Sequence, residues 1–305
     1  MNKEQLNHCI ICPRHCGADR YSDKLGYCKT GTDFHIGAVT VHKGEEPFIS
    51  GKMGICNIFF SRCNLQCIYC QNYQISRNKE KIVDYNYNLN DLTEKIISIL
   101  DTGVHAVGFV SPSHCIAQMK MIITALHQRG KRPVVVMNTN AYDNAEILHT
   151  LEGMIDIYLP DFKYMDSNLS KKYSDVSDYP EIALKAIKEM YRQKGSMLRY
   201  DDDGQGESGL IIRHLILPGH VENSLAVLRC IAEELSTSVH ISLMSQYYPT
   251  ESVKDHPVIG RRLNPDEYEM VVREMEFLGF YNGWIQELES SSSYIPDFIK
   301  EHPFE

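Results

Sequence analysis

The sequence lacks the features that indicate export, a membrane or a large nucleic-acid partner. Its first residues, MNKEQLNHCIICPRHCG, contain no apolar stretch like that of a signal peptide. Among the longest apolar runs is Leu210–Leu217, which is far too short to span a bilayer and is interrupted by Arg213 and His214. No run of lysine and arginine stands out in a chain of net charge −9. We therefore expect a cytoplasmic protein that binds neither membrane nor nucleic acid.

Cysteine is the informative residue type. Ten cysteines in a chain without an export signal are expected to be free thiols, because the cytosol is reducing. Tight groups of such cysteines indicate metal binding. Seven of the ten fall into two groups, namely Cys9, Cys12, Cys16 and Cys28, and then Cys63, Cys67 and Cys70. The other three, Cys56, Cys115 and Cys230, are interpreted as core residues, since free cysteine is commonly buried.

Apolar runs alternate with helical patterns from about residue 50 onward. Helical spacing of apolar residues occurs at Leu92, Ile96 and Leu100, at Met119, Ile122, Ile123 and Leu126, and at Leu225, Leu228, Ile231 and Leu235. Between these helices we expect six strands, at Ile55–Phe60, Val104–Val110, Val134–Met137, Ile155–Leu159, Leu210–Leu217 and Val239–Met244. Such alternation predicts an α/β fold with a parallel sheet. Six units fall short of the eight in a closed barrel, so we predict a partial (β/α)6 TIM-like barrel.

The first 50 residues differ from the rest, being rich in Cys, His and Gly with little periodicity. We assign residues 1–50 to a small cysteine-rich metal-binding module. Residues 51–305 are assigned to the (β/α)6 core with a C-terminal helical extension. In barrels and open parallel sheets alike, chemistry is expected at the C-terminal ends of the strands.

The second cysteine group follows the first predicted strand directly. Its spacing is C-x3-C-x2-C, in Cys63-Asn64-Leu65-Gln66-Cys67-Ile68-Tyr69-Cys70-Gln71-Asn72. Thiolates suit iron–sulfur clusters or zinc. Three thiolates can hold three irons of a cubane cluster and leave the fourth iron open for substrate chemistry. A structural zinc site normally has four protein ligands, and no fourth cysteine or histidine follows at finger spacing. The strand context, the spacing and the flanking residues together favour a 4Fe-4S cluster over a zinc site or three unrelated core thiols.

The triplet and its flanks resemble the signature of radical SAM enzymes, and most closely the branch similar to pyruvate formate-lyase activating enzyme. The resemblance extends over nearly the whole chain. It includes the segments Cys12-Pro13-Arg14-His15-Cys16-Gly17, Glu46-Pro47-Phe48-Ile49-Ser50-Gly51, Tyr158-Leu159-Pro160-Asp161-Phe162-Lys163-Tyr164, Arg213-His214-Leu215-Ile216-Leu217-Pro218-Gly219 and Met244-Ser245-Gln246-Tyr247.

The resemblance implies a concrete activity. The open iron would bind S-adenosylmethionine (SAM), and an electron from a flavodoxin or ferredoxin would drive cleavage to a 5′-deoxyadenosyl radical that abstracts hydrogen. It also implies that Tyr69 packs near adenine and that Asp161 and Lys163, at a strand end, contact the ribose and carboxylate of SAM. Arg213 either reaches SAM or forms a buried salt bridge. Gln246 is expected near adenine.

One position departs from the family pattern. Many radical SAM enzymes have a Gly-Gly-Glu-like stretch after the second strand that binds the SAM amino group. Here the stretch Gly108–His114 contains no glutamate. Ser111, and with it Ser113 and His114, are expected to supply hydrogen bonds to SAM or substrate instead. The triplet Asn138-Thr139-Asn140, after the third strand, either faces the pocket or caps its loop.

The N-terminal quartet, Cys9-x2-Cys12-x3-Cys16-x11-Cys28, places four thiolates in a segment with little core of its own. Such segments often need a metal to fold. A zinc or single-iron site closed by all four cysteines is favoured, and an auxiliary iron–sulfur cluster is the alternative.

Together these features predict a radical SAM oxidoreductase that activates a glycyl-radical protein or acts on a peptide glycine. A second hypothesis is a radical SAM enzyme that modifies a peptide or small molecule. A third, from another class, is a zinc-binding or redox-sensing module without catalysis.

Overall fold

One open sheet forms the centre of the molecule. The computed structural model describes residues 4–288, 295–300 and 302–304. Within them, ten strands form a single sheet in the order β10-β9-β8-β6-β5-β4-β2-β1-β3, with β7 paired to β8. The strands are β1 (Phe34–His42), β2 (Ile55–Phe60), β3 (Tyr85–Tyr87), β4 (Ala106–Val110), β5 (Val134–Thr139), β6 (Ile157–Pro160), β7 (Arg199–Tyr200), β8 (Gly206–Leu215), β9 (His240–Met244) and β10 (Gly283–Ile285).

Along the path β2-β4-β5-β6-β8-β9-β10 every neighbouring pair of strands is parallel. The six predicted strands are confirmed as β2, β4, β5, β6, β8 and β9, in the predicted order. All six residues of β2 are buried, as expected for a parallel strand covered on both faces. The architecture is therefore the predicted α/β partial barrel, left open at its edges.

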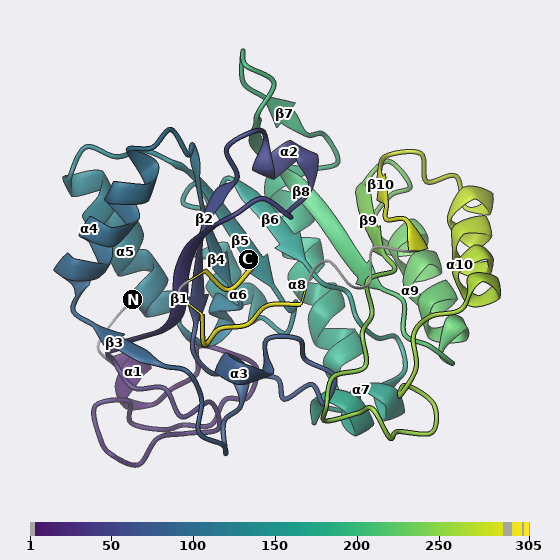
Figure 1. The fold of residues 1–305 in the computed structure, drawn as a ribbon, viewed down its shortest axis with the longest axis horizontal. Helices are drawn as coiled ribbons and strands as arrows, with labels where there is room; N and C mark the ends of the chain where they lie inside the picture. The colour runs from purple at the N-terminus through teal and green to yellow at the C-terminus, as the bar shows by residue number, and fades with distance from the viewer. Residues whose placement is uncertain (1–3, 289–294, 301, 305) are drawn as a thin grey trace.

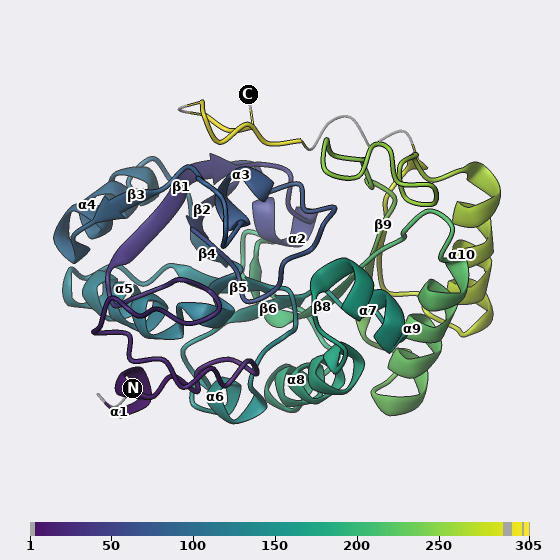
Figure 2. The same ribbon diagram turned by 90° about the horizontal axis from the view of Figure 1, so that it is seen from below.

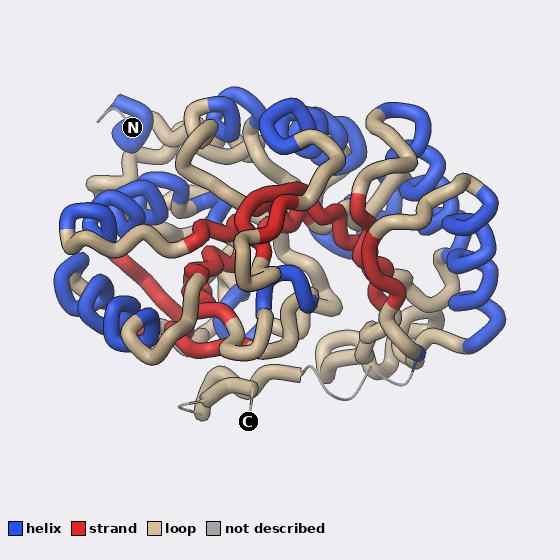
Figure 3. The backbone as a smooth tube through the Cα atoms, turned by 90° about the horizontal axis from the view of Figure 1, so that it is seen from above, coloured by secondary structure: helices blue, strands red, loops and turns tan. Residues whose placement is uncertain are grey.

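Helices surround this sheet, and the longer ones cover its outer face (Figure 1, Figure 3). They are α1 (Glu4–Asn7), α2 (Pro47–Ser50), α3 (Tyr73–Ser76), α4 (Leu89–Leu100), α5 (Ile116–Gln128), α6 (Ala145–His149), α7 (Ser167–Ser174), α8 (Tyr179–Lys194), α9 (Val221–Glu234), α10 (Pro265–Phe277) and the 3-10 helix η1 (Pro112–His114). The predicted apolar face of α5 is confirmed, since Met119, Ile122, Ile123 and Leu126 are all buried, whereas Leu100 of α4 and Leu235, just after α9, are partly buried. No helix in the described ranges is long and apolar enough to cross a bilayer.

Local sequence signals set the helix ends. Asn264 and Glu267 form a reciprocal capping box at the start of α10, and Pro265 occupies the first helical position, where its missing N–H costs nothing. Asn88 caps α4 by accepting a hydrogen bond from the Asp91 amide. These caps fix the first residue of each helix and therefore the end of the loop that precedes it.

The sequence did not reveal the antiparallel edge. Strand β1 pairs antiparallel with β2 from Ile36 to His42, and β3 pairs antiparallel with β1. Part of the segment assigned to an N-terminal module thus belongs to the main sheet, while the domain division at residue 50 stays a prediction. After α10 the chain adds β10 beside β9, and near the C-terminus the described residues 295–300 and 302–304 form a segment without helix or strand.

That C-terminal segment lies across the side of the sheet that the long helices leave uncovered (Figure 2). The ring of Phe298 packs against Phe59 with centroids 5.2 Å apart, and the ring of Phe304 lies 4.1 Å from that of His42. Gln74 of α3 donates a hydrogen bond to Asp297. The segment therefore bridges back to β1, β2 and α3.

Candidate active site

A cavity of about 380 Å³ opens at the C-terminal ends of the parallel strands. Nine of the residues that were expected to hold the cluster or to contact SAM line it: Cys63, Cys67, Cys70, Tyr69, Ser111, Asp161, Lys163, Arg213 and Gln246. Asn138 and Asn140, from the end of β5, line it as well. The N-terminal cysteine quartet does not contribute to its walls. The cavity thus brings together residues spread over more than 180 positions of sequence.

A tight turn after β2 presents the cysteine triplet. Arg62 has φ of +70°, a left-handed conformation that is uncommon for a residue with a side chain. Its amide donates to the carbonyl of Ile75 at 2.7 Å, and its guanidinium donates to the carbonyl of Arg77 at 3.0 Å. These contacts hold the turn in place, and the chain then enters the cavity at Cys63.

The Cys63 thiol is buried and accepts two hydrogen bonds. The Leu65 amide and the Asn140 side-chain amide each lie 3.4 Å from Cys63 Sγ. Burial raises the pKa of Cys63 to about 12, with the nearby Cys67 adding to the effect. At neutral pH this thiol therefore holds its proton until a metal displaces it.

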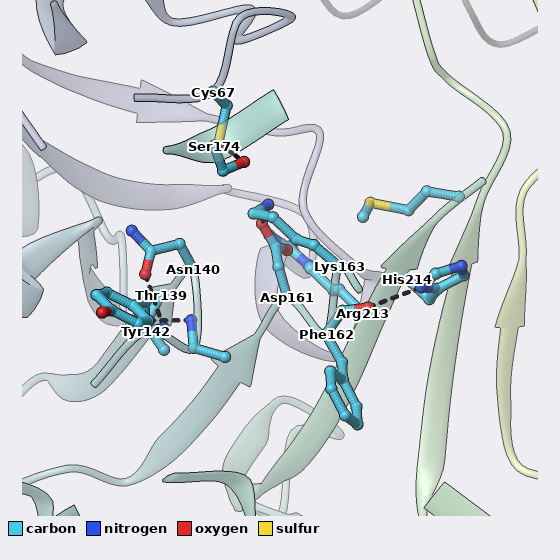
Figure 4. Close-up of polar contacts among 12 residues, drawn as sticks. Cys67, Thr139, Asn140, Tyr142, Asp161, Phe162, Lys163, Ser174, Arg213 and His214 are labelled. Atoms are coloured by element: carbon cyan, nitrogen blue, oxygen red, sulfur yellow. Dashed lines mark hydrogen bonds and ion pairs between the residues drawn. The ribbon is translucent and has the colours of Figure 1, made fainter. Parts of the chain in front are cut away.

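The other two thiols each accept a hydrogen bond from a serine. Ser174, the last residue of α7, places Oγ 3.0 Å from Cys67 Sγ (Figure 4). Ser76, the last residue of α3, places Oγ 3.4 Å from Cys70 Sγ. Burial raises the pKa of Cys67 too, although Lys163 opposes that rise. Each cysteine of the triplet is thus held by a donor from a different element.

The thiol arrangement fits a multi-iron cluster. In the described part of the chain, no three His, Cys, Asp or Glu side chains are placed to hold a single metal ion. A cubane spreads its thiolates over separate irons, so its ligands need not converge on one atom. Three soft thiol donors around one cavity, where no other described cysteine contributes, are therefore suited to a 4Fe-4S cluster with one iron left open.

Asp161 and Lys163 follow β6 and lie on the same side of the sheet as Cys67 (Figure 4). Lys163 Nζ lies 2.5 Å from Asp161 Oδ2, and both side chains are mostly buried. Burial alone would lower the pKa of Lys163, but Asp161 and Cys67 outweigh it and the net shift is upward. Lys163 therefore remains a cation beside the thiols, placed to pair with a carboxylate of a ligand.

Arg213 of β8 forms a buried ion-pair network. Its guanidinium bonds to both Glu45 and Glu46, with Nε 2.8 Å from Glu46 Oε1. Asn57 of β2 donates to Glu45 at 2.7 Å. Burial alone would raise the pKa of Glu45, yet Arg213 and His42 hold it below its usual value. Of the two alternatives for Arg213, the structure contains the buried salt bridge, on a side chain that also lines the cavity.

The carboxylates of Glu45 and Glu46 were missed in the sequence analysis. Glu46 stood within a segment of family resemblance but received no role, and adjacent acids before a proline give no signal of their own. Their position between β1 and α2 became clear only once β1 was found to pair with β2.

Of the three polar residues predicted after β4, one lines the cavity and two do not. Ser111, with φ of +51°, lines the cavity. Ser113 and His114 are buried away from it: Ser113 bonds to Thr139, and His114 Nε2 bonds to the carbonyl of Ser61. The expectation that Ser113 and His114 contact SAM or substrate is therefore not supported by their placement, whereas that for Ser111 remains a prediction.

Gln246, after β9, is held on two sides. Its carbonyl accepts from the Gln71 side chain at 3.2 Å, and its side-chain oxygen accepts from Gln286 at 2.9 Å. Tyr247 beside it is buried and packs 6.0 Å from Tyr69 between ring centroids. Gln246 and Tyr69 thus face the same cavity, as the predicted contacts with adenine require.

The N-terminal quartet lies apart from the cavity. Cys9, Cys12 and Cys28 are buried, whereas Cys16 is exposed. The buried Arg20 donates to Cys9 Sγ at 3.1 Å. The favoured zinc or single-iron site is not confirmed by this geometry, and both it and the auxiliary cluster remain predictions.

Comparison with known proteins places these residues in context. Residues 57–198 match the model of the radical SAM superfamily. An uncharacterised protein of Methanocaldococcus jannaschii is 28% identical over 287 residues, covering 92% of this chain and 77% of that protein.

Among solved structures, HydG, a maturase of the [FeFe]-hydrogenase, aligns with a TM-score of 0.51 at 14% identity, covering 76% of this chain and 51% of HydG. A structure of anSMEcpe with bound AdoMet aligns with a TM-score of 0.51 at 11% identity, covering 79% of this chain and 60% of that one. The chain therefore spans only about half the length of HydG, and at such identities the likeness concerns the fold.

Proposed function

Because residues 57–198 match the radical SAM superfamily, we propose that the cavity binds a 4Fe-4S cluster on Cys63, Cys67 and Cys70 and binds SAM beside it. The bound cluster would supply one electron to cleave SAM reductively to methionine and a 5′-deoxyadenosyl radical that abstracts hydrogen. The single observation that carries this proposal is that three thiols and the Asp161–Lys163 pair line one cavity at the strand ends.

The residues of the chain have distinct parts in this proposal. Lys163 pairs with the carboxylate of SAM, and Asp161 accepts hydrogen bonds from its ribose hydroxyls. Tyr69 and Gln246 flank the adenine, and Ser111 offers a hydroxyl at the C-terminal end of β4. Arg213, held by two carboxylates, fixes the wall between β8 and the β1–α2 connection.

The test is SAM cleavage by the reconstituted protein. Incubation with iron, sulfide, dithionite and SAM should yield 5′-deoxyadenosine, and Cys67→Ala should abolish it together with most of the bound sulfide. The matched control is Cys230→Ala, which removes a buried thiol on α9 that does not line the cavity and should leave both readouts intact. A wild-type protein that is loaded with cluster but cleaves no SAM would contradict the proposal.

We further propose that the substrate is a glycine residue of a protein or peptide, and that a flavodoxin or ferredoxin supplies the electron. The support is the motif resemblance to activating enzymes. A glycyl-radical EPR doublet on a partner protein would support activation. A stable modified peptide or small molecule would favour the alternative radical SAM chemistry.

A further inference from the structure

A chain of hydroxyl groups connects the cavity wall to a cluster ligand. Tyr69 Oη lies 2.6 Å from Tyr164 Oη, which lies 2.8 Å from Ser174 Oγ. Ser174 Oγ in turn lies 3.0 Å from Cys67 Sγ. We refer to Tyr69, Tyr164 and Ser174 as the hydroxyl relay.

The proton count fixes the direction of the relay. Each hydroxyl has one proton to donate, and a metal-bound thiolate has none. Ser174 must therefore donate to Cys67, which leaves the Ser174 oxygen to accept from Tyr164. By the same argument, Tyr164 accepts from Tyr69. All three dipoles then point toward Cys67 Sγ.

The relay is shielded from water. Ser174 and Tyr164 are fully buried, and Tyr69 is 6% exposed. In such a low-dielectric setting, hydrogen bonds strengthen, and bonds in a chain polarise one another. The other thiols lack this arrangement: Cys70 accepts from Ser76 at 3.4 Å, and Cys63 accepts from amides at 3.4 Å. Cys67 thus has the shortest of these hydrogen bonds.

We infer that the hydroxyl relay raises the reduction potential of the cluster. Its members are positioning residues, because they act by orienting the Ser174 hydroxyl toward Cys67. Hydrogen bonds to cluster sulfurs are among the factors that set this potential. Reduction adds negative charge to the cluster and its thiolates, so donors aimed at Cys67 stabilise the reduced form more than the oxidised form. The inference rests on the proposed function only in that it needs a cluster at the triplet.

The relay also begins at the cavity. Tyr69 lines the cavity and packs against Tyr247, so a ligand bound there contacts the first hydroxyl-bearing ring of the chain.

The experiment is a redox titration of the reconstituted protein, followed by the EPR signal of the reduced cluster. Ser174→Ala should shift the midpoint potential to a more negative value. Tyr164→Phe and Tyr69→Phe should shift it less, in the same direction. In the Ser174→Ala background, Tyr69→Phe should add no further shift, because its link to Cys67 is already cut.

The matched control is Tyr173→Phe. The ring of Tyr173 packs edge-on to Tyr69, but its hydroxyl bonds to His220, outside the relay. It should leave the potential unchanged. Tyr164→Phe keeps its ring and tests the relay even where Ser174→Ala fails to retain iron.

Two outcomes would overturn the inference: an unchanged potential in Ser174→Ala at full iron and sulfide content, or a shift in Tyr173→Phe as large as that in Tyr164→Phe. The SAM-cleavage assay separates this from the proposed function. Cleavage by the wild type with no shift in the relay variants refutes the relay alone. A shift without any cleavage refutes the function alone, and a chain that takes up no iron refutes both.

Discussion

Lys163 Nζ and Asp161 Oδ2 lie 2.5 Å apart beside the Cys67 thiol, on a strand end that faces the cavity. The pair is mostly buried, so its charges are screened little by solvent. This short separation keeps Lys163 charged in a site where burial alone would favour its neutral form.

Lys163→Met should weaken SAM binding by about tenfold or more, because a charge-assisted hydrogen bond contributes roughly 1.5–3 kcal/mol. The measurement is equilibrium binding of SAM to cluster-loaded protein. Lys185→Met is the control, since Lys185 pairs with Glu181 on the exposed face of α8. If the Lys163 variant and the wild type bind SAM with equal affinity, Lys163 does not contact SAM.

Arg213→Met should lower the free energy of unfolding by about 3–5 kcal/mol, because it leaves Glu45 and Glu46 buried without their cation. Urea unfolding measures this loss. Adding Glu45→Gln and Glu46→Gln to the variant should restore part of it. Arg229→Met, which breaks a pair with Glu274 on a half-exposed arginine, should cost less than about 1 kcal/mol. Similar losses in both arginine variants would contradict the prediction.

Acid should destabilise the fold through two buried histidines. Burial lowers the pKa of His114 and of His214 to about 4, below the 6.5 of an ordinary histidine. Between pH 6.5 and pH 4 the unfolded chain therefore binds more protons than the folded chain. Each histidine contributes stability that is present above pH 6.5 and is lost as the pH falls through 4, by about 3 kcal/mol.

The check is the unfolding free energy measured from pH 7 to pH 4. His214→Gln should reduce the slope between pH 6.5 and 4, because the amide can still donate to the Phe162 carbonyl that the ring now bonds. An unchanged slope would show that His214 does not titrate on unfolding.

Asp143 should give the unfolding free energy the opposite pH dependence, with stability falling as the pH rises. Burial raises its pKa to about 6, although the Thr139 hydroxyl donates to it and opposes the rise. The folded chain then binds more protons, so stability falls as the pH rises from 3.8 through 6, by about 3 kcal/mol. Asp143→Asn keeps an oxygen for the Thr139 hydroxyl and should remove this fall. A variant with the same pH profile as the wild type would refute it.

The central sheet could be predicted because its signal is local. The six predicted strands are mainly apolar runs, and three of the helices between them show apolar residues at helical spacing, as Met119 to Leu126 do. The cysteine triplet could be placed for the same reason: its position directly after β2 puts it at the strand ends, where residues from several strands meet.

Pairing across long separations and unusual backbone conformations could not be predicted. Strand β1 precedes β2 but pairs with it antiparallel, and its nine residues carry no clear alternation. The left-handed backbone at Arg62 and Ser111 is set by tertiary contacts and not by residue type. The relay depends on Tyr164 and Ser174 meeting Tyr69, some hundred positions away, and no spacing rule signals that contact.

Asn78 connects the two cysteine groups. Its side-chain amide donates to the carbonyls of Tyr27 and Cys63, at 3.0 and 2.8 Å, while its oxygen accepts from the Cys63 amide at 3.3 Å. Tyr27 directly precedes Cys28 of the quartet. A displacement at Cys28 is thereby passed, through a single amide group, to the peptide bonds on both sides of Cys63, so the two sets of thiols are mechanically joined.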